Sequence, residues 1–314
     1  MNEKELEQIA VLVAQKLGAR VPPVSRERGA GLSGVSPPAS EVSETQHSAA
    51  STAKLLATAP GSQLPAPVHR RVAAYVDHTI LKAEATRAEI EQLCDEAAQY
   101  RFAAVCVNGG WVKLCAQRLH GTAVKVATVV GFPLGATTSH SKAAEARELV
   151  ELGACELDMV APVGHILDED WDYVEDDIGA VVAAATGRAV KVILETAALE
   201  PMQIVKASAI AMEAGAHFVK TSTGFHPSGG ATAEAVALMR LAVGDRLGVK
   251  ASGGVRDCAT ALRMIAAGAT RIGTSSGVKL VECIGAGPAP LAQLLADPDG
   301  HEQICRLGRC AADY

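Results

Sequence analysis

Aromatic residues are scarce in this 314-residue chain, which has four phenylalanines, four tyrosines and two tryptophans. Long apolar runs are missing too: no stretch of about eighteen apolar residues occurs, so no segment is expected to span a membrane. Blocks of lysine and arginine are absent and the net charge is -6, which argues against a nucleic-acid partner. Glu3, Glu5 and Glu7 lie where a signal peptide carries positive charge, so we expect a cytoplasmic protein.

Cysteine is not scarce, but the eight cysteines lack the spacing of a metal site or a redox pair. No C-x-x-C pair and no cysteine–histidine cluster with zinc spacing occurs. Five cysteines lie inside apolar patterns, where a thiol acts as a small hydrophobic side chain: Cys94, Cys106, Cys115, Cys155 and Cys258. We therefore expect reduced, mostly structural cysteines and no bound metal.

The composition changes near residue 67. Half of the fourteen prolines fall between Pro22 and Pro67, serine is frequent there, and no aromatic residue precedes Tyr75. Such a segment cannot bury enough apolar surface to compensate for the entropy lost on ordering. Residues 19–66 are therefore predicted to be a flexible linker.

Residues 1–18 precede this linker and predict a short amphipathic helix. One apolar stripe follows the helical period: Leu6, Ile9, Ala10, Val13 and Leu17. A helix this short is marginal alone in water, so a partner is expected. The segment resembles the encapsulation peptides that dock enzymes on shell proteins of bacterial microcompartments, a helix-in-groove mode of recognition. A self-association helix, a membrane-surface helix and an unstructured tail are the alternatives.

Residues 67–314 predict one α/β domain, a (β/α)8 TIM barrel with a C-terminal tail. Short buried strands are predicted at Ala74–Leu81, Ala103–Asn108, Lys125–Pro133, Glu156–Ala161, Val190–Thr196, His217–Thr223, Gly248–Ser252 and Arg271–Ser275. Amphipathic helices between them include Arg87–Tyr100, Ser139–Leu152, Glu200–Ala214, Ala233–Val243 and Cys258–Ala267. Eight strand–helix repeats predict parallel βαβ units that close into a barrel. An open doubly wound sheet would need a glycine fingerprint after its first strand, and none is present there.

Four charged residues interrupt the predicted strands: Asp77, Asp158, Lys220 and Lys250. A salt bridge inside the barrel is one explanation, because such residues are rarely buried unless paired. If both lysines face inward, burial and like charge lower the pKa of one of them, which gives the neutral amine that attacks a carbonyl. The other lysine stays charged, and Asp158 can shuttle protons. These residues alone do not decide which lysine is the nucleophile.

The loops after the seventh and eighth strands predict a phosphate site. Gly253 and Gly254 follow the strand of Lys250, and Gly273, Ser275 and Ser276 follow or end the last strand before a helix. Glycines allow close backbone approach, and N–H groups, hydroxyls and a helix N-terminus bind anions. Glycines that merely turn the chain are the alternative, but TIM barrels frequently bind phosphate at these two loops.

Eight motifs resemble, in order, those of the deoxyribose-phosphate aldolases: DHTILKAEAT, VCVN, GFPLGATTSHSKAAEA, ELDMV, KVILET, FVKTSTGF, VKASGGVRD and RIGTSSG. They cover nearly the whole predicted barrel. The resemblance implies reversible cleavage of 2-deoxy-D-ribose 5-phosphate to D-glyceraldehyde 3-phosphate and acetaldehyde, without cofactor or metal. It also implies that Lys220 forms the Schiff base, with Lys250 and Asp158 as proton-transfer partners.

The same resemblance implies further site residues. The phosphate site would comprise Gly224, Gly253, Gly254, Gly273, Ser275 and Ser276. Apart from what the resemblance implies, further candidate substrate contacts are Asp77, Cys106, Thr196 and Tyr314, the last because some family members also end in tyrosine. A packed core thiol is the alternative for Cys106, and a disordered end is the alternative for Tyr314. Lys191 lies at the start of its strand, the end that usually serves stability, so it is not expected in the site.

The chain departs from the family pattern in two places. Ala161 and Pro162 replace Ile and Asn after the fourth strand, and Phe225 stands where some members carry a basic residue, so one phosphate contact is expected to be missing. The alternatives to this function are another class I aldolase or a transaldolase with a different sugar phosphate, and a non-catalytic cargo or scaffold protein. A homodimer is expected, because barrels of this kind often pair.

Overall fold

The structure is a computed structural model that describes residues 71–285, 291 and 295 of the chain. The predicted helix at residues 1–18, the linker at 19–66 and Tyr314 lie outside the described residues. Within the described part, no helix is both long enough and apolar enough to cross a membrane.

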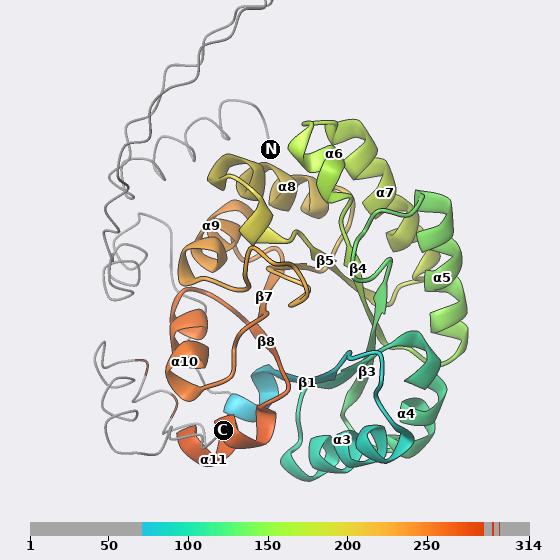
Figure 1. The fold of residues 1–314 in the computed structure, drawn as a ribbon, viewed down its shortest axis with the longest axis vertical. Coiled ribbons are helices and arrows are strands. Elements are labelled where there is room, and N and C mark those ends of the chain that lie inside the picture. Colours follow the sequence, from blue (N-terminus) through green and yellow to red (C-terminus); the bar gives the residue numbers. More distant parts are fainter. Residues whose placement is uncertain (1–70, 286–290, 292–294, 296–314) are drawn as a thin grey trace, which may run out of the picture.

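Eight parallel strands form one closed barrel in the order β1 to β8, with β8 hydrogen-bonded to β1 (Figure 1). The strands are β1 Val76–Ile80, β2 Ala104–Val107, β3 Lys125–Val130, β4 Glu156–Val160, β5 Ala189–Ile193, β6 Phe218–Lys220, β7 Gly248–Ser252 and β8 Arg271–Thr274. The helices are α3 Arg87–Tyr100, α4 Val112–Arg118, α5 Ser139–Glu151, α6 Val163–Leu167, α7 Trp171–Ala184, α8 Pro201–Glu213, α9 Ala233–Val243, α10 Cys258–Ala266 and α11 Gly277–Ile284. The predicted TIM barrel is confirmed.

Side-chain caps begin four of the helices that follow strands. The hydroxyls of Thr86, Thr138 and Thr232 and the carboxylate of Asp257 accept hydrogen bonds from backbone N–H groups in the first turns of α3, α5, α9 and α10. Each cap satisfies an N–H group that would otherwise lack a partner. The caps therefore define where the loops at the C-terminal ends of β1, β3, β6 and β7 stop.

Two apolar clusters form the core, and they lie on opposite sides of the strands. The large cluster fills the layer between the barrel and its helices. The small one consists of Ala104, Cys106, Ala127 and Val129, with Leu81 and Phe132 packed against it. Since period-two alternation points successive side chains to opposite faces, the remaining inward positions are free for polar groups. The charged residues of the barrel occupy such positions.

One prediction about cysteine is wrong. Cys258 on α10 and Cys283 on α11 form a disulfide, with their Cα atoms 6.5 Å apart. The two cysteines are 25 residues apart and lie in separate amphipathic helices, so only the packing of α10 against α11 reveals the pair. Cys94, Cys106 and Cys115 are buried free thiols, as expected.

Candidate active site

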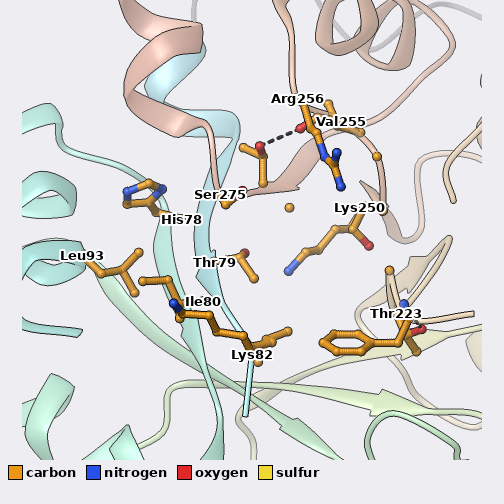
Figure 2. A pocket seen from close by; sticks show the side chains of 18 of the residues that line it. His78, Thr79, Ile80, Lys82, Leu93, Thr223, Lys250, Val255, Arg256 and Ser275 are labelled. Carbon is orange, nitrogen blue, oxygen red and sulfur yellow. Dashed lines mark hydrogen bonds between the residues drawn. The ribbon is translucent and has the colours of Figure 1, made fainter. Parts of the chain in front are cut away.

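A cavity of about 800 Å³ opens at the C-terminal ends of the strands (Figure 2). Its lining comes from β1, β6, β7 and β8, from the loops that follow them, and from α3. Lys220 and Lys250 both reach this cavity, although both side chains are almost completely buried. The two predicted lysines therefore meet at the C-terminal end of the barrel, where TIM-barrel enzymes have their active sites.

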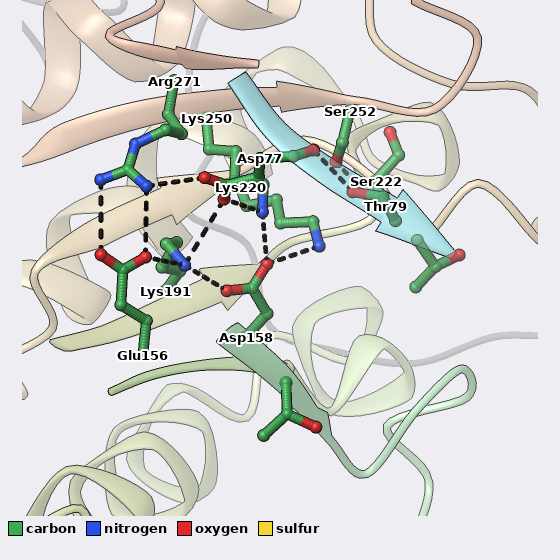
Figure 3. A network of polar contacts seen from close by, with 12 residues as sticks. Asp77, Thr79, Glu156, Asp158, Lys191, Lys220, Ser222, Lys250, Ser252 and Arg271 are labelled. Atoms are coloured by element: carbon green, nitrogen blue, oxygen red, sulfur yellow. Dashed lines mark hydrogen bonds and ion pairs between the residues drawn. The ribbon is translucent and has the colours of Figure 1, made fainter. Parts of the chain in front are cut away.

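Strand register explains why the two lysines meet. Lys220 ends β6 and is paired with Lys250 of β7, while Asp158 of β4 is paired with Lys191 of β5. Each of these four side chains lies inside the barrel and is buried. Parallel pairing places Lys220 and Lys250 side by side, and Asp158 reaches them from across the barrel interior (Figure 3).

Asp158 is the centre of the charged cluster. Its Oδ2 atom accepts from the Nζ atoms of Lys220 at 2.8 Å and Lys250 at 2.7 Å, and its Oδ1 atom accepts from Lys191 at 2.6 Å. Burial by itself raises the pKa of this carboxyl, but the three lysines outweigh burial and hold the pKa well below its usual value. Asp158 is therefore ionised and links the two lysines of the cavity by short hydrogen bonds.

The two cavity lysines have opposite pKa shifts. Burial lowers the pKa of Lys220, the charge of Lys250 lowers it further, and Asp158 only partly compensates. Burial also acts on Lys250, but Asp158 and Asp77 outweigh it and raise the pKa of Lys250 above its usual value. The difference arises because Lys250 has a second carboxylate, Asp77, at 2.5 Å. Lys220 is thus the amine that gives up its proton more easily.

Three predicted substrate contacts do not line the cavity. Asp77 is fully buried and pairs with Lys250 and Arg271. Cys106 lies in the small apolar cluster, where burial raises the pKa of its thiol. Thr196 follows β5, and its hydroxyl is buried without a hydrogen-bond partner among the described residues. Tyr314, the fourth predicted contact, lies outside the described residues.

Lys191, which its predicted position at the start of a strand excludes from the site, belongs to the charged cluster in the structure. Its Nζ atom lies 2.6 Å from Asp158 and 2.7 Å from Glu156, and its side chain is fully buried. Arg271 joins from β8 and contacts both Asp77 and Glu156. Alternation along a strand could have predicted that Glu156 and Arg271 face the barrel interior. Glu156 lies two residues before Asp158, and Arg271 lies two residues before Gly273, so each shares the inward face of its strand.

The predicted phosphate loops line the cavity on its β7 and β8 side. Gly224, Gly253, Gly254, Gly273 and Ser275 belong to its wall, while Ser276 lies beside it, directly before α11. Gly253 has a φ of 87°, and a Cβ there would lie 3.1 Å from the Cα of Gly230. A Cβ at Gly273 would lie 3.0 Å from the Cε of Lys250. Glycine is therefore needed at 253 for the turn and at 273 to make room for the lysine.

Arg256, two residues after Gly254, is a further cavity residue that the sequence patterns do not predict. Its exposed side chain lines the cavity and points into it (Figure 2). Phe225 lines the cavity as well and makes an edge contact with Phe132, with ring centroids 5.3 Å apart. An aromatic pair thus occupies the position where the predicted family pattern has a basic residue in some members, while Arg256 carries a positive charge on the neighbouring loop.

A TIM barrel whose cavity holds a lysine of lowered pKa beside a charged lysine has the features of a lysine-dependent enzyme. Residues 71–281 match the family described as DeoC/LacD family aldolase. The chain belongs to this family, so the predicted resemblance is confirmed.

The relatives carry a consistent name. The deoxyribose-phosphate aldolase of Geobacillus sp. (strain WCH70) is 57% identical over 216 residues, which cover 68% of this chain and 96% of the relative. That of Histophilus somni (strain 2336) is 52% identical over 210 residues, covering 67% of this chain and 93% of the relative. Among solved structures, the deoxyribose phosphate aldolase from Aeropyrum pernix, described as having a unique tetrameric structure, is similar with a TM-score of 0.63 and 34% identity over 67% of this chain and 89% of that one.

Proposed function

We propose that this aldolase catalyses the reversible cleavage of 2-deoxy-D-ribose 5-phosphate to D-glyceraldehyde 3-phosphate and acetaldehyde through a Schiff base on Lys220. The observation that carries this proposal is the pair of cavity lysines with opposite pKa shifts, joined by one carboxylate oxygen of Asp158. The names of the curated relatives support the choice of substrate.

In this mechanism the neutral amine of Lys220 attacks the C1 aldehyde of the open-chain sugar and forms a carbinolamine. Lys250 donates a proton to the departing hydroxyl, water leaves, and an iminium ion results. The iminium then accepts the electrons of the C2–C3 bond while a base removes the proton of the C3 hydroxyl, which releases the three-carbon aldehyde. The remaining enamine takes a proton at C2, and water hydrolyses the imine to free Lys220 and acetaldehyde.

Proton transfers in these steps need a relay, and Asp158 is the group we assign to it. Its Oδ2 atom accepts from both Lys220 and Lys250, so a proton can pass between the two amines through one carboxylate. The relay lies inside the barrel, away from bulk water, where charge interactions are stronger than in solvent. No step requires a metal ion.

We assign the 5-phosphate to the loops after β6, β7 and β8. Gly224, Gly253, Gly254, Gly273, Ser275 and Ser276 would supply backbone N–H groups and hydroxyls, and Arg256 would supply a positive charge. Support comes from the position of all these residues except Ser276 in the cavity wall, and from the start of α11 directly after Ser276. The N-terminus of a helix carries a partial positive charge that favours anions.

The proposed activity is tested by adding 2-deoxy-D-ribose 5-phosphate to the purified protein and measuring acetaldehyde release. We expect turnover that EDTA does not reduce, because the lysine chemistry needs no metal. Faster turnover of another sugar phosphate would instead indicate a different class I aldolase or a transaldolase, and no turnover of any sugar phosphate would favour a scaffold protein.

Light scattering on the same sample tests the expected dimer. The Aeropyrum pernix relative is described as tetrameric.

For residues 1–18 we propose docking on a microcompartment shell protein, which would place the enzyme inside a shell in the cytoplasm. The apolar stripe of the predicted helix supports this proposal. Deleting residues 1–18 is expected to leave turnover unchanged, because the family match begins only at residue 71. A fluorescent fusion should lose co-localisation with shells on the same deletion.

A matched pair of point variants sharpens this test. Val13→Asp places a charge on the apolar stripe and should abolish shell recruitment, whereas Gln15→Asp makes the same addition on the polar side and should not. Recruitment that survives Val13→Asp, or turnover lost on deletion, would contradict the proposed role.

A further inference from the structure

The buried cluster around Asp158 contains more cationic groups than carboxylates (Figure 3). Its four cationic side chains are Lys191 from β5, Lys220 from β6, Lys250 from β7 and Arg271 from β8, and its three carboxylates are Asp77 from β1, Glu156 and Asp158 from β4. With all seven ionised, four positive charges face three negative ones. An unpaired charge is costly in a buried site, so the cluster is balanced when one lysine is neutral.

The two remaining strands, β2 and β3, add no charge to this sum. From β2, Cys106 faces the lysines, and burial raises the pKa of its thiol, so it stays protonated near neutral pH. From β3, Ala127 and Val129 lie in the same small apolar cluster as Cys106. The buried carboxylate of Glu195, in the loop after β5, accepts instead from the N–H and hydroxyl of Thr223. Among the strand residues, the excess of one positive charge therefore belongs to the seven groups themselves.

Contacts decide which lysine loses its proton at least cost. Lys250 has two carboxylates, Asp77 and Asp158, and Arg271 also has two. Lys191 contacts Asp158 and Glu156 closely and Asp77 at 3.7 Å. Lys220 has a single carboxylate contact among the described residues, on the Asp158 oxygen that it shares with Lys250. The neutral lysine of a balanced cluster is therefore Lys220.

We propose that Lys191 is a positioning residue whose positive charge keeps Lys220 neutral and nucleophilic. Lys191 does not line the cavity and binds Oδ1 of Asp158, the oxygen that Lys220 does not contact. Its charge partly neutralises the Asp158 carboxylate, which would otherwise stabilise the protonated form of Lys220. Lys191 is also the fourth cation of the cluster. This inference rests on the proposed role of Lys220 as the Schiff-base lysine.

The test uses three variants whose effects on pH dependence differ in sign. Lys191→Met leaves three cations and three carboxylates, so Lys220 keeps its proton to higher pH and the acid limb of the kcat/KM profile should move up by about 1 to 3 pH units. Glu156→Gln leaves four cations and two carboxylates and should move the limb to lower pH. The double variant restores an excess of one cation, so its limb should return close to that of the unmodified protein.

A second measurement reports on the protonation of the Lys220 amine without requiring cleavage of a carbon–carbon bond. The pH dependence of borohydride trapping of acetaldehyde on Lys220, measured by mass spectrometry, should shift in the same directions. Lys142→Met is the matched control, because Lys142 is also fully buried and pairs with Asp177 at 2.7 Å, but it joins α5 to α7 outside the barrel. This control should lower the melting temperature and leave the acid limb in place.

The outcomes separate the two hypotheses. An unmoved acid limb in Lys191→Met, or a double variant that does not return, overturns the role of Lys191 while leaving the proposed function intact. An adduct that never forms on Lys220 in the unmodified protein overturns the proposed function instead. If Lys191→Met does not fold, Glu156→Gln still decides the question, since a limb that fails to move to lower pH contradicts the charge balance.

Discussion

Replacing Lys220 with alanine is expected to lower kcat by at least about 10⁴-fold, because no other group replaces the imine that accepts the electrons of the breaking carbon–carbon bond. Lys250 cannot substitute for it, since Asp77 and Asp158 raise its pKa and keep it protonated. The measurement is acetaldehyde release from 2-deoxy-D-ribose 5-phosphate, together with borohydride trapping. The mass increase found on the unmodified protein should be absent from the variant.

Folding of the variant is not expected to limit this test. Lys220→Ala leaves three cations and three carboxylates in the cluster, and Asp158 keeps its contacts with Lys191 and Lys250. Lys142→Met serves again as the control for loss of a buried lysine, and it should retain turnover and the adduct on Lys220. An adduct mapped to Lys250, or full activity without any adduct, would show that Lys220 is not the nucleophile.

Much of the barrel could be predicted because its signals are local. Each strand is a short apolar run bounded by polar residues, and each helix repeats apolar residues at the helical period. The predicted strand at Gly248–Ser252 and the predicted helices at Arg87–Tyr100 and Ala233–Val243 have the bounds that the structure shows. The other predicted strands extend past the observed ends, for instance to Thr223 where β6 stops at Lys220. Of these extra residues, Leu81, Thr223 and Ser275 line the cavity.

The interior of the site was harder to predict, because it depends on which strands face each other. The sequence indicates that Asp158, Lys220 and Lys250 are unusual in apolar strands, yet it does not show that Asp158 accepts from three lysines at once. The position rule for TIM barrels excluded Lys191, although strand register pairs it with Asp158. The rule failed because β5 begins at Ala189, which puts Lys191 in the middle of the strand, directly opposite Asp158.

Contacts between helices distant in sequence could not be predicted either. Cys258 looked like one more buried thiol on an amphipathic helix, and only the packing of α10 on α11 shows its bond to Cys283. Arg256 gave a weak signal of its own, since an exposed arginine after two glycines is common in loops. We include it in the proposed phosphate site because its side chain points into the cavity.

The phosphate assignment predicts the second large effect, on substrate choice. Ser275→Asp places a negative charge on the cavity wall, where Ser275 is exposed directly after β8. Repulsion of the sugar phosphate should lower kcat/KM for 2-deoxy-D-ribose 5-phosphate by about 10²-fold, which corresponds to about 2.7 kcal/mol. Activity on unphosphorylated 2-deoxy-D-ribose should not change, because that substrate carries no charge to repel.

The same substitution should not harm the fold, which makes the comparison informative. A carboxylate near the start of α11 interacts favourably with the positive end of the helix dipole, so the melting temperature should be kept or slightly raised. Ser275→Asn is the matched neutral control, nearly identical in shape to aspartate, and it should retain most of the activity on the phosphorylated sugar. Equal losses on both sugars in Ser275→Asp would mean that the loop after β8 serves the fold alone and that the phosphate binds elsewhere.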